Sequence, residues 1–293
     1  TGKPQPPAPL DAPPLDPADP TDRREKLAAW LTADDNPLFA RSVANRVWAN
    51  FFGRGLVDPV DDLRASNPAS DEALLDALAT YLVDHGFDLK ALMRLVLTSA
   101  TYARSSTPTT DDPAAAKVLA HYPPRRLMAE VLHDAIVSVT GVPTDFNQIT
   151  IADGSTQKTD FYPTGTRAVQ LYDSAVESYF LETFGRNPRD ISCECERSNQ
   201  PSLVQALHLN NGPTINDKLA TPDNTVDHLL TDHPASPDLV GHAFLTTLSR
   251  FPTPAESQAY TNILDNTPPE QKRHATEDLL WSLLTSREFL FQH

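Results

Sequence analysis

The sequence has few cysteines, no long hydrophobic run and no excess of positive charge. Its 293 residues include 2 cysteines, too few and too close together for a disulfide framework. No stretch approaches the roughly 18 consecutive apolar residues that span a bilayer, so we expect no membrane span. The 24 Lys and Arg residues face 39 Asp and Glu residues, which gives a formal net charge of −15. Because phosphate backbones repel so acidic a chain, nucleic acid is disfavoured as a partner, and neutral or basic partners are favoured.

Catalytic and cofactor signatures are also missing. The sequence contains no Gly-x-Ser-x-Gly elbow, Walker loop, Gly-x-Gly-x-x-Gly, His-Glu-x-x-His or Cys-x-x-Cys-His motif. Hydrolase, NTPase, dinucleotide-binding, zincin and covalent haem functions therefore lose their usual support. We expect no cofactor in this chain, and the sequence leaves open whether it is an enzyme.

What the sequence does have is a proline-rich start followed by amphipathic helices. Residues 1–20 are crowded with proline and lack apolar periodicity, so we expect an extended linker there. From residue 21 onward apolar residues recur at helical spacing, and a hydrophobic content of 40% suffices for a large core. The pattern predicts an all-α, multi-helix fold with a single helical domain over residues 21–293.

Capping residues predict where several helices begin. Asp22, Asn36 and Asp71 each stand just before a run of apolar periodicity, as helix N-caps do. A further helix is expected from about 124 to 140, with Arg126 and Glu130 four residues apart on it. That pair is either an exposed surface pair or a buried one that joins two elements.

Residues 141–173 interrupt the helical pattern. This stretch loses its apolar periodicity and gathers Thr, Gly and Asp, which indicates an irregular insertion with room for a short β-hairpin. Within it, residues 166–172 alternate in the manner of a short strand.

The chain also contains a short internal repeat, which we call the internal echo. Residues 88–102 resemble residues 275–289, and both stretches end in Leu-Thr-Ser-x-x-aromatic. We therefore expect a duplicated helical hairpin with both copies packed in one domain. The closing aromatics, Tyr102 and Phe289, should be largely buried.

Both cysteines lie in one charged segment, residues 184–201. Cys193 and Cys195 could supply two thiolates to a metal ion, with His208 or His133 as further ligands. Two thiols do not complete a site, so no metal is firmly predicted. The alternatives are a labile disulfide between the two cysteines and inert buried thiols.

Several motifs together carry a family resemblance. They include Asn-Pro-Leu-Phe-Ala-Arg at 36–41, Phe-Gly-Arg-Gly-Leu-Val at 52–57 and Leu-Thr-Ser-Ala-Thr-Tyr at 97–102. Others are Arg-Arg-Leu-Met-Ala-Glu at 125–130, Gln-Ala-Leu-His-Leu-Asn at 205–210 and the closing Glu-Phe-Leu-Phe at 288–291. In this order they resemble the planctomycete-specific domain of unknown function 1553, over nearly the whole chain after the linker.

The resemblance implies a cellular location and neighbouring domains, but no activity. Members of that family usually follow a cytochrome-c-like domain and a second uncharacterised domain in large exported proteins. It therefore implies an extracytoplasmic location, periplasmic or at the cell surface, and upstream domains of the same parent protein as partners. Haem would then belong to a separate domain of the parent.

Arginines stand inside these motifs although the chain is acidic. They are Arg41, Arg46, Arg54, Arg125, Arg126 and Arg197. Two explanations remain open: structural ion pairs with Glu130, Glu194 and Glu196, or a cleft that binds carboxylated or sulfated glycans. In the first case, we expect Arg126, Glu130 and Arg197 to form one partly buried cluster beside the two cysteines.

Two functions remain under consideration. The first is an accessory or interaction module of a larger extracytoplasmic assembly, linked to polysaccharide processing next to an electron-transfer domain. The second is a glycan-acting enzyme in which paired carboxylates serve as acid and base. The candidate pairs are Glu194 with Glu196 and Glu130 with Asp134.

Overall fold

The computed structural model describes residues 5–9, 13–16, 18–33, 35–108, 110, 115, 118–151, 153–172, 174–188 and 201–292. The chain divides into two compact units, an N-terminal unit that ends at Pro123 and a C-terminal unit, Pro124–Gln292. Each unit encloses its own hydrophobic core. This differs from the single helical domain expected over 21–293, because periodicity marks apolar faces without showing which faces share a core.

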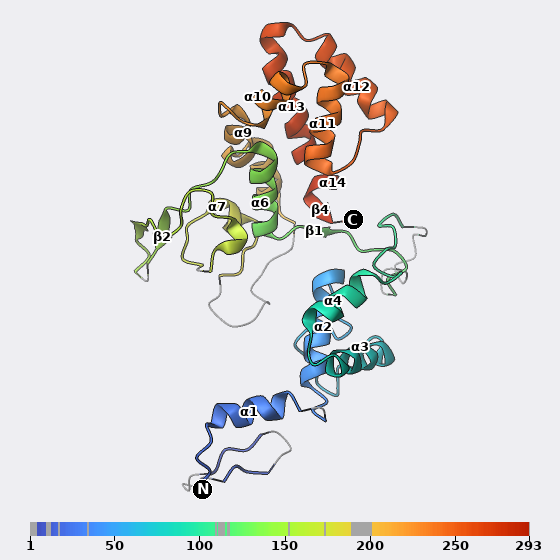
Figure 1. The fold of residues 1–293 in the computed structure, drawn as a ribbon, viewed down its shortest axis with the longest axis vertical. Helices are drawn as coiled ribbons and strands as arrows, with labels where there is room; N and C mark the ends of the chain where they lie inside the picture. The colour runs from blue at the N-terminus through green and yellow to red at the C-terminus, as the bar shows by residue number, and fades with distance from the viewer. Residues whose placement is uncertain are drawn as a thin grey trace. The chain divides into compact units, whose positions relative to one another are not determined.

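Helices dominate both units, which confirms the all-α prediction (Figure 1). Those of the N-terminal unit are α1 (Arg23–Leu31), α2 (Phe39–Phe52), α3 (Glu72–Asp84) and α4 (Leu89–Leu97). The main helices of the C-terminal unit are α6 (Ala129–Thr140), α7 (Tyr179–Thr183), α8 (Leu203–Asn211), α9 (Pro213–Ala220), α10 (Thr225–Asp232), α11 (Ser236–Leu248), α12 (Pro254–Asp265), α13 (Lys272–Leu284) and α14 (Arg287–Leu290). No helix among the described residues is long and apolar enough to cross a membrane.

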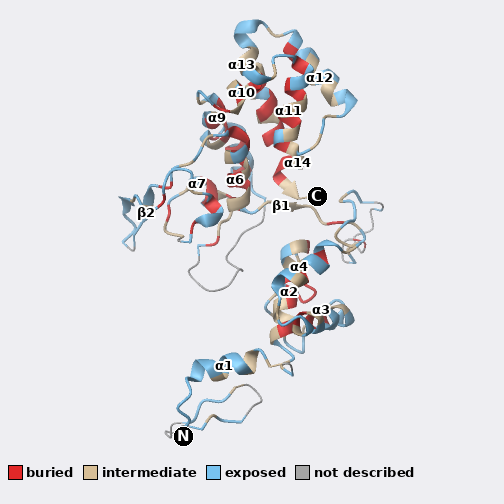
Figure 2. Ribbon diagram, viewed as in Figure 1, coloured by how far each residue is buried: buried red, intermediate tan, exposed pale blue. Residues whose placement is uncertain are grey.

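α1 and α3 begin where the capping residues predicted, whereas α2 begins at Phe39, three residues after Asn36. The side chains of Asp22 and Asp71 accept backbone N–H bonds at the starts of α1 and α3, and Asn36 Oδ1 accepts from the amides just before and at the start of α2. α2, α3 and α4 enclose the core, in which Phe52 and Leu75 are fully buried. α1 has no buried residue, as Figure 2 shows.

Short strands make two antiparallel pairs in the C-terminal unit. β2 (Gln148–Thr150) and β3 (Thr156–Lys158) form the hairpin expected inside the insertion. β1 (Arg125–Arg126) pairs with β4 (Phe291–Gln292), which ties the start of the unit to its end.

Two sequence-based predictions are wrong in detail. The helix expected from 124 begins only at Ala129, because the two arginines before it pair with β4 as a strand. Arg126 therefore does not share a helix with Glu130. The strand expected over 166–172 is instead the 3-10 helix η1 (Ala168–Gln170), whose first amides bond to Asp134 on α6.

The two halves of the internal echo are built by the same local hydrogen bonds. The Thr98 and Thr285 hydroxyls each donate 2.8 Å bonds to the carbonyl four residues earlier. The Ser99 and Ser286 hydroxyls each accept a 3.2 Å bond from the backbone N–H of the closing aromatic residue.

We call these two hydrogen-bonded segments the corners at Ser99 and Ser286. The first follows the helix pair α3–α4, which packs on α2, and the second follows the pair α12–α13, which packs on α11. The copies lie in different units, not in one domain as expected. Phe289 is buried, whereas Tyr102 is only half-buried.

Candidate functional site

The predicted site residues fall into three groups. Arg41 and Arg46 belong to the N-terminal unit, whereas Arg126, Glu130 and His208 belong to the C-terminal unit. A third group lies outside the described residues and comprises Cys193, Glu194, Cys195, Glu196 and Arg197. The predicted cluster of Arg126, Glu130 and Arg197 beside the cysteines therefore stays a prediction.

Both arginines of the N-terminal unit hold acidic side chains. Arg41 on α2 pairs with Glu72 and Asp76 on α3, and Arg46 Nη2 lies 2.5 Å from Asp61 Oδ1. The acids that the sequence suggested as partners were others: Glu130, Glu194 and Glu196. An incoming anion would have to compete with these carboxylates for the two guanidinium groups.

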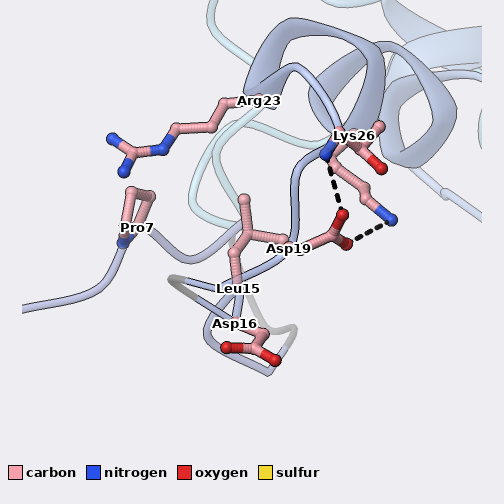
Figure 3. Close-up of a pocket in the computed structure, with 7 residues that line it drawn as sticks. Pro7, Leu15, Asp16, Asp19, Arg23 and Lys26 are labelled. Carbon is pink, nitrogen blue, oxygen red and sulfur yellow. Dashed lines mark hydrogen bonds and ion pairs between the residues drawn. The ribbon is translucent and has the colours of Figure 1, made fainter.

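The cavities beside these elements are small. One of about 120 Å³ is lined by Leu38, Arg41, Val57 and Glu72 among others. Another of about 50 Å³ lies between the proline-rich start and α1, where Lys26 Nζ is 2.9 Å from Asp19 Oδ2 (Figure 3). Pockets for small-molecule ligands typically measure about 300–1,000 Å³, so neither cavity suits a glycan chain.

Two buried histidines flank the ring of Phe180 in the C-terminal unit. His133 on α6 and His208 on α8 have ring centroids 5.5 Å and 5.7 Å from that of Phe180. The Nε2 atom of each lies within hydrogen-bond distance of a threonine hydroxyl, Thr144 at 3.0 Å and Thr214 at 2.9 Å. Burial lowers the pKa of both histidines, so both are neutral near pH 7.

We expect the free energy of unfolding of the C-terminal unit to fall as the pH drops below about 6.5. The folded pKa values of His133 and His208 lie below the unfolded value, so at mildly acidic pH the unfolded chain binds more protons. Each group contributes a slope of up to about 1.4 kcal/mol per pH unit. Urea denaturation between pH 7.5 and 5 measures this slope.

Replacing one buried histidine should flatten that dependence. His133→Gln keeps a polar side chain but removes a titrating group, so its slope should be smaller than that of the parent. His274→Gln is the control, because His274 is exposed. Equal slopes in His133→Gln and the parent would show that His133 is protonated as readily in the folded chain as in the unfolded one.

Two further buried polar side chains fasten the insertion to the helices. Asp134 on α6 accepts bonds from the Ala168 and Val169 amides, at 2.6 Å and 3.2 Å. Lys218 on α9 donates to the carbonyls of Val142 and Pro143, at 2.7 Å and 2.9 Å, and burial lowers its pKa to about 8. Both residues therefore position the polypeptide between α6 and α7.

This role of Asp134 bears on the predicted acid–base pairs. Arg167 Nε also lies 3.4 Å from the Asp134 carboxylate, in addition to the two amides. A carboxylate that satisfies two backbone amides is committed to structure, which removes support for Glu130 with Asp134 as a glycosidase pair. The other pair, Glu194 with Glu196, lies outside the described residues.

Arg126 lies at the edge of the same aromatic layer. Its Nη2 donates a 2.9 Å bond to the Phe184 carbonyl, and its guanidinium lies 5.4 Å from the Phe184 ring centroid. Phe184 in turn stacks on Phe180, with centroids 4.3 Å apart. Arg126, Phe184, Phe180 and His208 thus form one continuous packed group.

α8 packs Leu209 into the core but otherwise buries polar side chains and exposes apolar ones. It turns Gln205 and His208 inward, where they are 7% and 8% exposed, but leaves Leu203, Val204 and Leu207 exposed to 74%, 52% and 53%. Gln205 is held by a 2.9 Å bond from its Nε2 to the Thr183 carbonyl. We call the three exposed residues the α8 apolar face.

The sequence did not reveal two arginines that each bond to several partners on different elements, which we call the arginine hubs. Arg250, after α11, bonds to Glu256 at the start of α12 and to Glu288 in α14, with contacts of 2.6–2.9 Å. The Arg250 bonds lower the pKa of Glu256 to about 2. The capping box formed by Thr253 and Glu256 was the available sequence signal.

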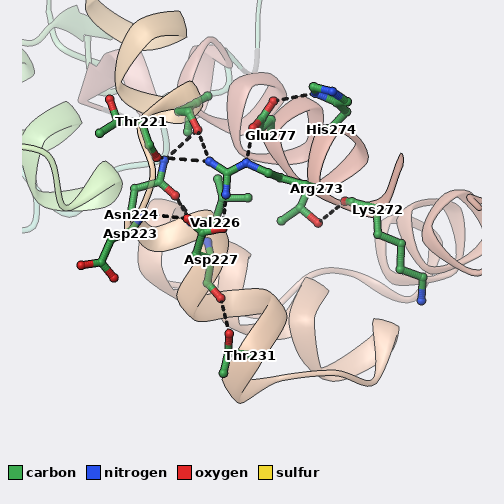
Figure 4. A network of polar contacts seen from close by, with 12 residues as sticks. Thr221, Asp223, Asn224, Val226, Asp227, Thr231, Lys272, Arg273, His274 and Glu277 are labelled. Carbon is green, nitrogen blue, oxygen red and sulfur yellow. Dashed lines mark hydrogen bonds and ion pairs between the residues drawn. The ribbon is translucent and has the colours of Figure 1, made fainter. Parts of the chain in front are cut away.

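Arg273 on α13 is the second hub. It pairs with Asp227 on α10 and with Glu277 one turn along its own helix, and it donates to the Leu219 and Thr221 carbonyls (Figure 4). Both arginines join elements of the fold, as structural ion pairs do. The spacing of Arg273 and Glu277 was visible in the sequence, but the other three partners depend on the tertiary fold.

Comparisons with known proteins give one family. A search of curated proteins and a search of solved structures each found no match to the chain. A family model, PSD1, described as a protein of unknown function (DUF1553), matches residues 23–264. Because this match spans most of the sequence and extends over both units, the chain belongs to the DUF1553 family.

Proposed function

We propose that this chain is an accessory interaction module of a larger extracytoplasmic assembly, and that it binds its partner through the α8 apolar face. The observation that carries the proposal is the orientation of α8, which exposes Leu203, Val204 and Leu207 while burying Gln205 and His208. Scattered exposed apolar residues are ordinary, but large ones gathered on a single helix turn are typical of interaction surfaces.

The surroundings of the helix support a preorganised surface. Ser202 and Gln205 form a capping box at the start of α8, and His208 packs against the rings of Phe180 and Phe184. The inward polar contacts therefore fix the rotation of the helix and with it the outward direction of the leucines.

The proposed partner is an upstream domain of the same parent protein. The family resemblance implies such domains, among them a cytochrome-c-like domain, and we propose that the assembly processes polysaccharide. We expect the partner's contact surface to be apolar at its centre, where it meets the α8 apolar face. Its rim should be neutral or basic, because this chain has a net charge of −15.

The proposal predicts that Leu203→Glu with Leu207→Glu weakens binding of the upstream domains at least tenfold. Two buried charges without partners would oppose the contact, whereas both side chains already face solvent in the chain alone. Isothermal titration calorimetry with the upstream domains supplied as a separate chain measures the affinity. Circular dichroism establishes that the variant remains folded.

Ile263→Glu provides the matched control. Ile263 is an exposed apolar residue on α12, so the same chemical change there should leave the affinity unaltered. Binding that is equal for the parent and the double variant would rule out the α8 apolar face. A loss of binding in Ile263→Glu as large as in the double variant would point to a nonspecific effect of charge.

A further inference from the structure

Three metal-ligating side chains meet where α10 turns into α11. His233 ends α10, Asp238 lies in the first turn of α11, and His242 follows one turn later on the same helix. One ligand atom from each of the three lies within 4.8 Å of the others. Neither the arginine hubs nor the α8 apolar face involves these residues.

The two imidazole rings converge on a single carboxylate. His233 Nδ1 lies 2.7 Å from Asp238 Oδ2, and His242 Nδ1 lies 3.3 Å from Asp238 Oδ1. The rings themselves are stacked, with centroids 3.5 Å apart and planes inclined by 19°. Both histidines therefore present the same ring nitrogen to the same small space.

We propose that His233, Asp238 and His242 bind one divalent transition-metal ion of the zinc class. Imidazole nitrogen and carboxylate oxygen are ligands that zinc accepts, at about 2.0–2.2 Å. Ligand atoms on a tetrahedral ion stand about 3.3 Å apart, a separation that the three side chains approach. Imidazole ligands favour zinc, copper or nickel over calcium and magnesium, which prefer all-oxygen sites.

The site is open on the solvent side. Asp238 is exposed, and both histidines retain exposed side-chain surface. Three protein ligands leave at least one position of a tetrahedral ion to water, which is the pattern of reactive zinc sites and not of closed structural ones.

The backbone on either side of the site is held in place. The His233 N–H donates a 3.0 Å bond to the Leu229 carbonyl, and the buried Ser236 hydroxyl donates a 2.6 Å bond to Asp265 on α12. Pro237 occupies the first turn of α11, where its fixed φ suits the helix. The end of α10 and the start of α11 therefore have little freedom to separate the ligands.

An ordinary histidine–carboxylate pair elsewhere in the chain shows the contrast. His274 Nδ1 lies 3.0 Å from Glu277 on the same helix, and no second histidine shares that carboxylate among the described residues. At Asp238, the two rings face different oxygens of one carboxylate, and His242 Nδ1 also lies 3.0 Å from the Asp238 backbone carbonyl. A metal ion bound by all three side chains would take the place of these contacts.

Zinc titration of the chain tests the site. Cys193→Ser and Cys195→Ser are introduced first, so that thiolates do not contribute to binding. Isothermal titration calorimetry at pH 7.4 is then expected to show one zinc ion per chain with a dissociation constant in the micromolar range. His242→Ala and Asp238→Asn should each weaken the binding at least tenfold, whereas His274→Ala should leave it unchanged.

X-ray absorption at the zinc edge gives a second readout and should show imidazole in the first coordination shell. A dissociation constant in the millimolar range or weaker for the thiol-free chain would overturn the proposal. So would affinities that Asp238→Asn leaves unaltered, because the ion would then bind a histidine pair and not the three-ligand site.

Discussion

Asn45→Ala is expected to lower the free energy of unfolding of the N-terminal unit by about 3 kcal/mol. Asn45 is fully buried on α2, and its side chain satisfies the loop that follows the helix. Nδ2 donates 2.9 Å bonds to the Val57 and Val60 carbonyls, and Oδ1 accepts a 3.0 Å bond from the Val57 N–H. Alanine would leave the buried Val57 amide and carbonyl without these partners, at a cost of about 1–3 kcal/mol for each.

Asn50→Ala on the same helix is the control for this prediction. Asn50 is exposed, so its replacement should change stability by less than about 0.5 kcal/mol. Urea denaturation can be followed through the fluorescence of Trp48, which lies in the core of this unit, after Trp30→Phe and Trp281→Phe remove the other tryptophans. A loss below about 1 kcal/mol for Asn45→Ala would mean that the loop finds other partners.

Gly212→Ala is expected to destabilise the C-terminal unit by about 3 kcal/mol, at the upper end of overpacking effects. A methyl group at Gly212 would lie 2.4 Å from the His208 carbonyl oxygen and 2.6 Å from His208 Nδ1. The backbone cannot yield without disturbing the end of α8, and the imidazole is enclosed by Phe180 and Phe184. Hydrogen exchange of the α6 amides would report the free energy of opening of this unit.

The same substitution at Gly241 should have the opposite sign. Gly241 lies inside α11, where an added methyl group meets no atom within 4 Å. Alanine there should stabilise the helix by about 0.5–1 kcal/mol. If Gly212→Ala also stabilised the unit, the tight contact with His208 would be refuted.

Local signals in the sequence predicted much of the fold. The caps at Asp22 and Asp71, the hairpin in the insertion and the matching corners at Ser99 and Ser286 all depend on residues within a few positions of one another. The strand at Arg125 could not be foreseen in this way, because its partner, Gln292, lies at the far end of the chain.

The division into two cores was equally hidden, since an amphipathic helix does not specify which neighbour covers it. The buried polar residues show the same limit. Asn45 and Gln205 both lie on helices, yet their roles depend on carbonyl groups 12 and 22 residues away. The α8 apolar face was concealed for a related reason, because Leu203 and Leu207 have the spacing of a core stripe and only the fold shows that they face outward.

Hydroxyl-radical footprinting of the chain alone and of the chain joined to its proposed upstream domains tests the central claim most directly. Leu203 and Leu207 are exposed in the chain alone and should be oxidised readily there. If the α8 apolar face binds these domains, the oxidation of Leu203 and Leu207 should fall several-fold in the joined protein, while that of Ile263 on α12 stays the same. Equal oxidation of Leu203 and Leu207 in both proteins would contradict the proposed function.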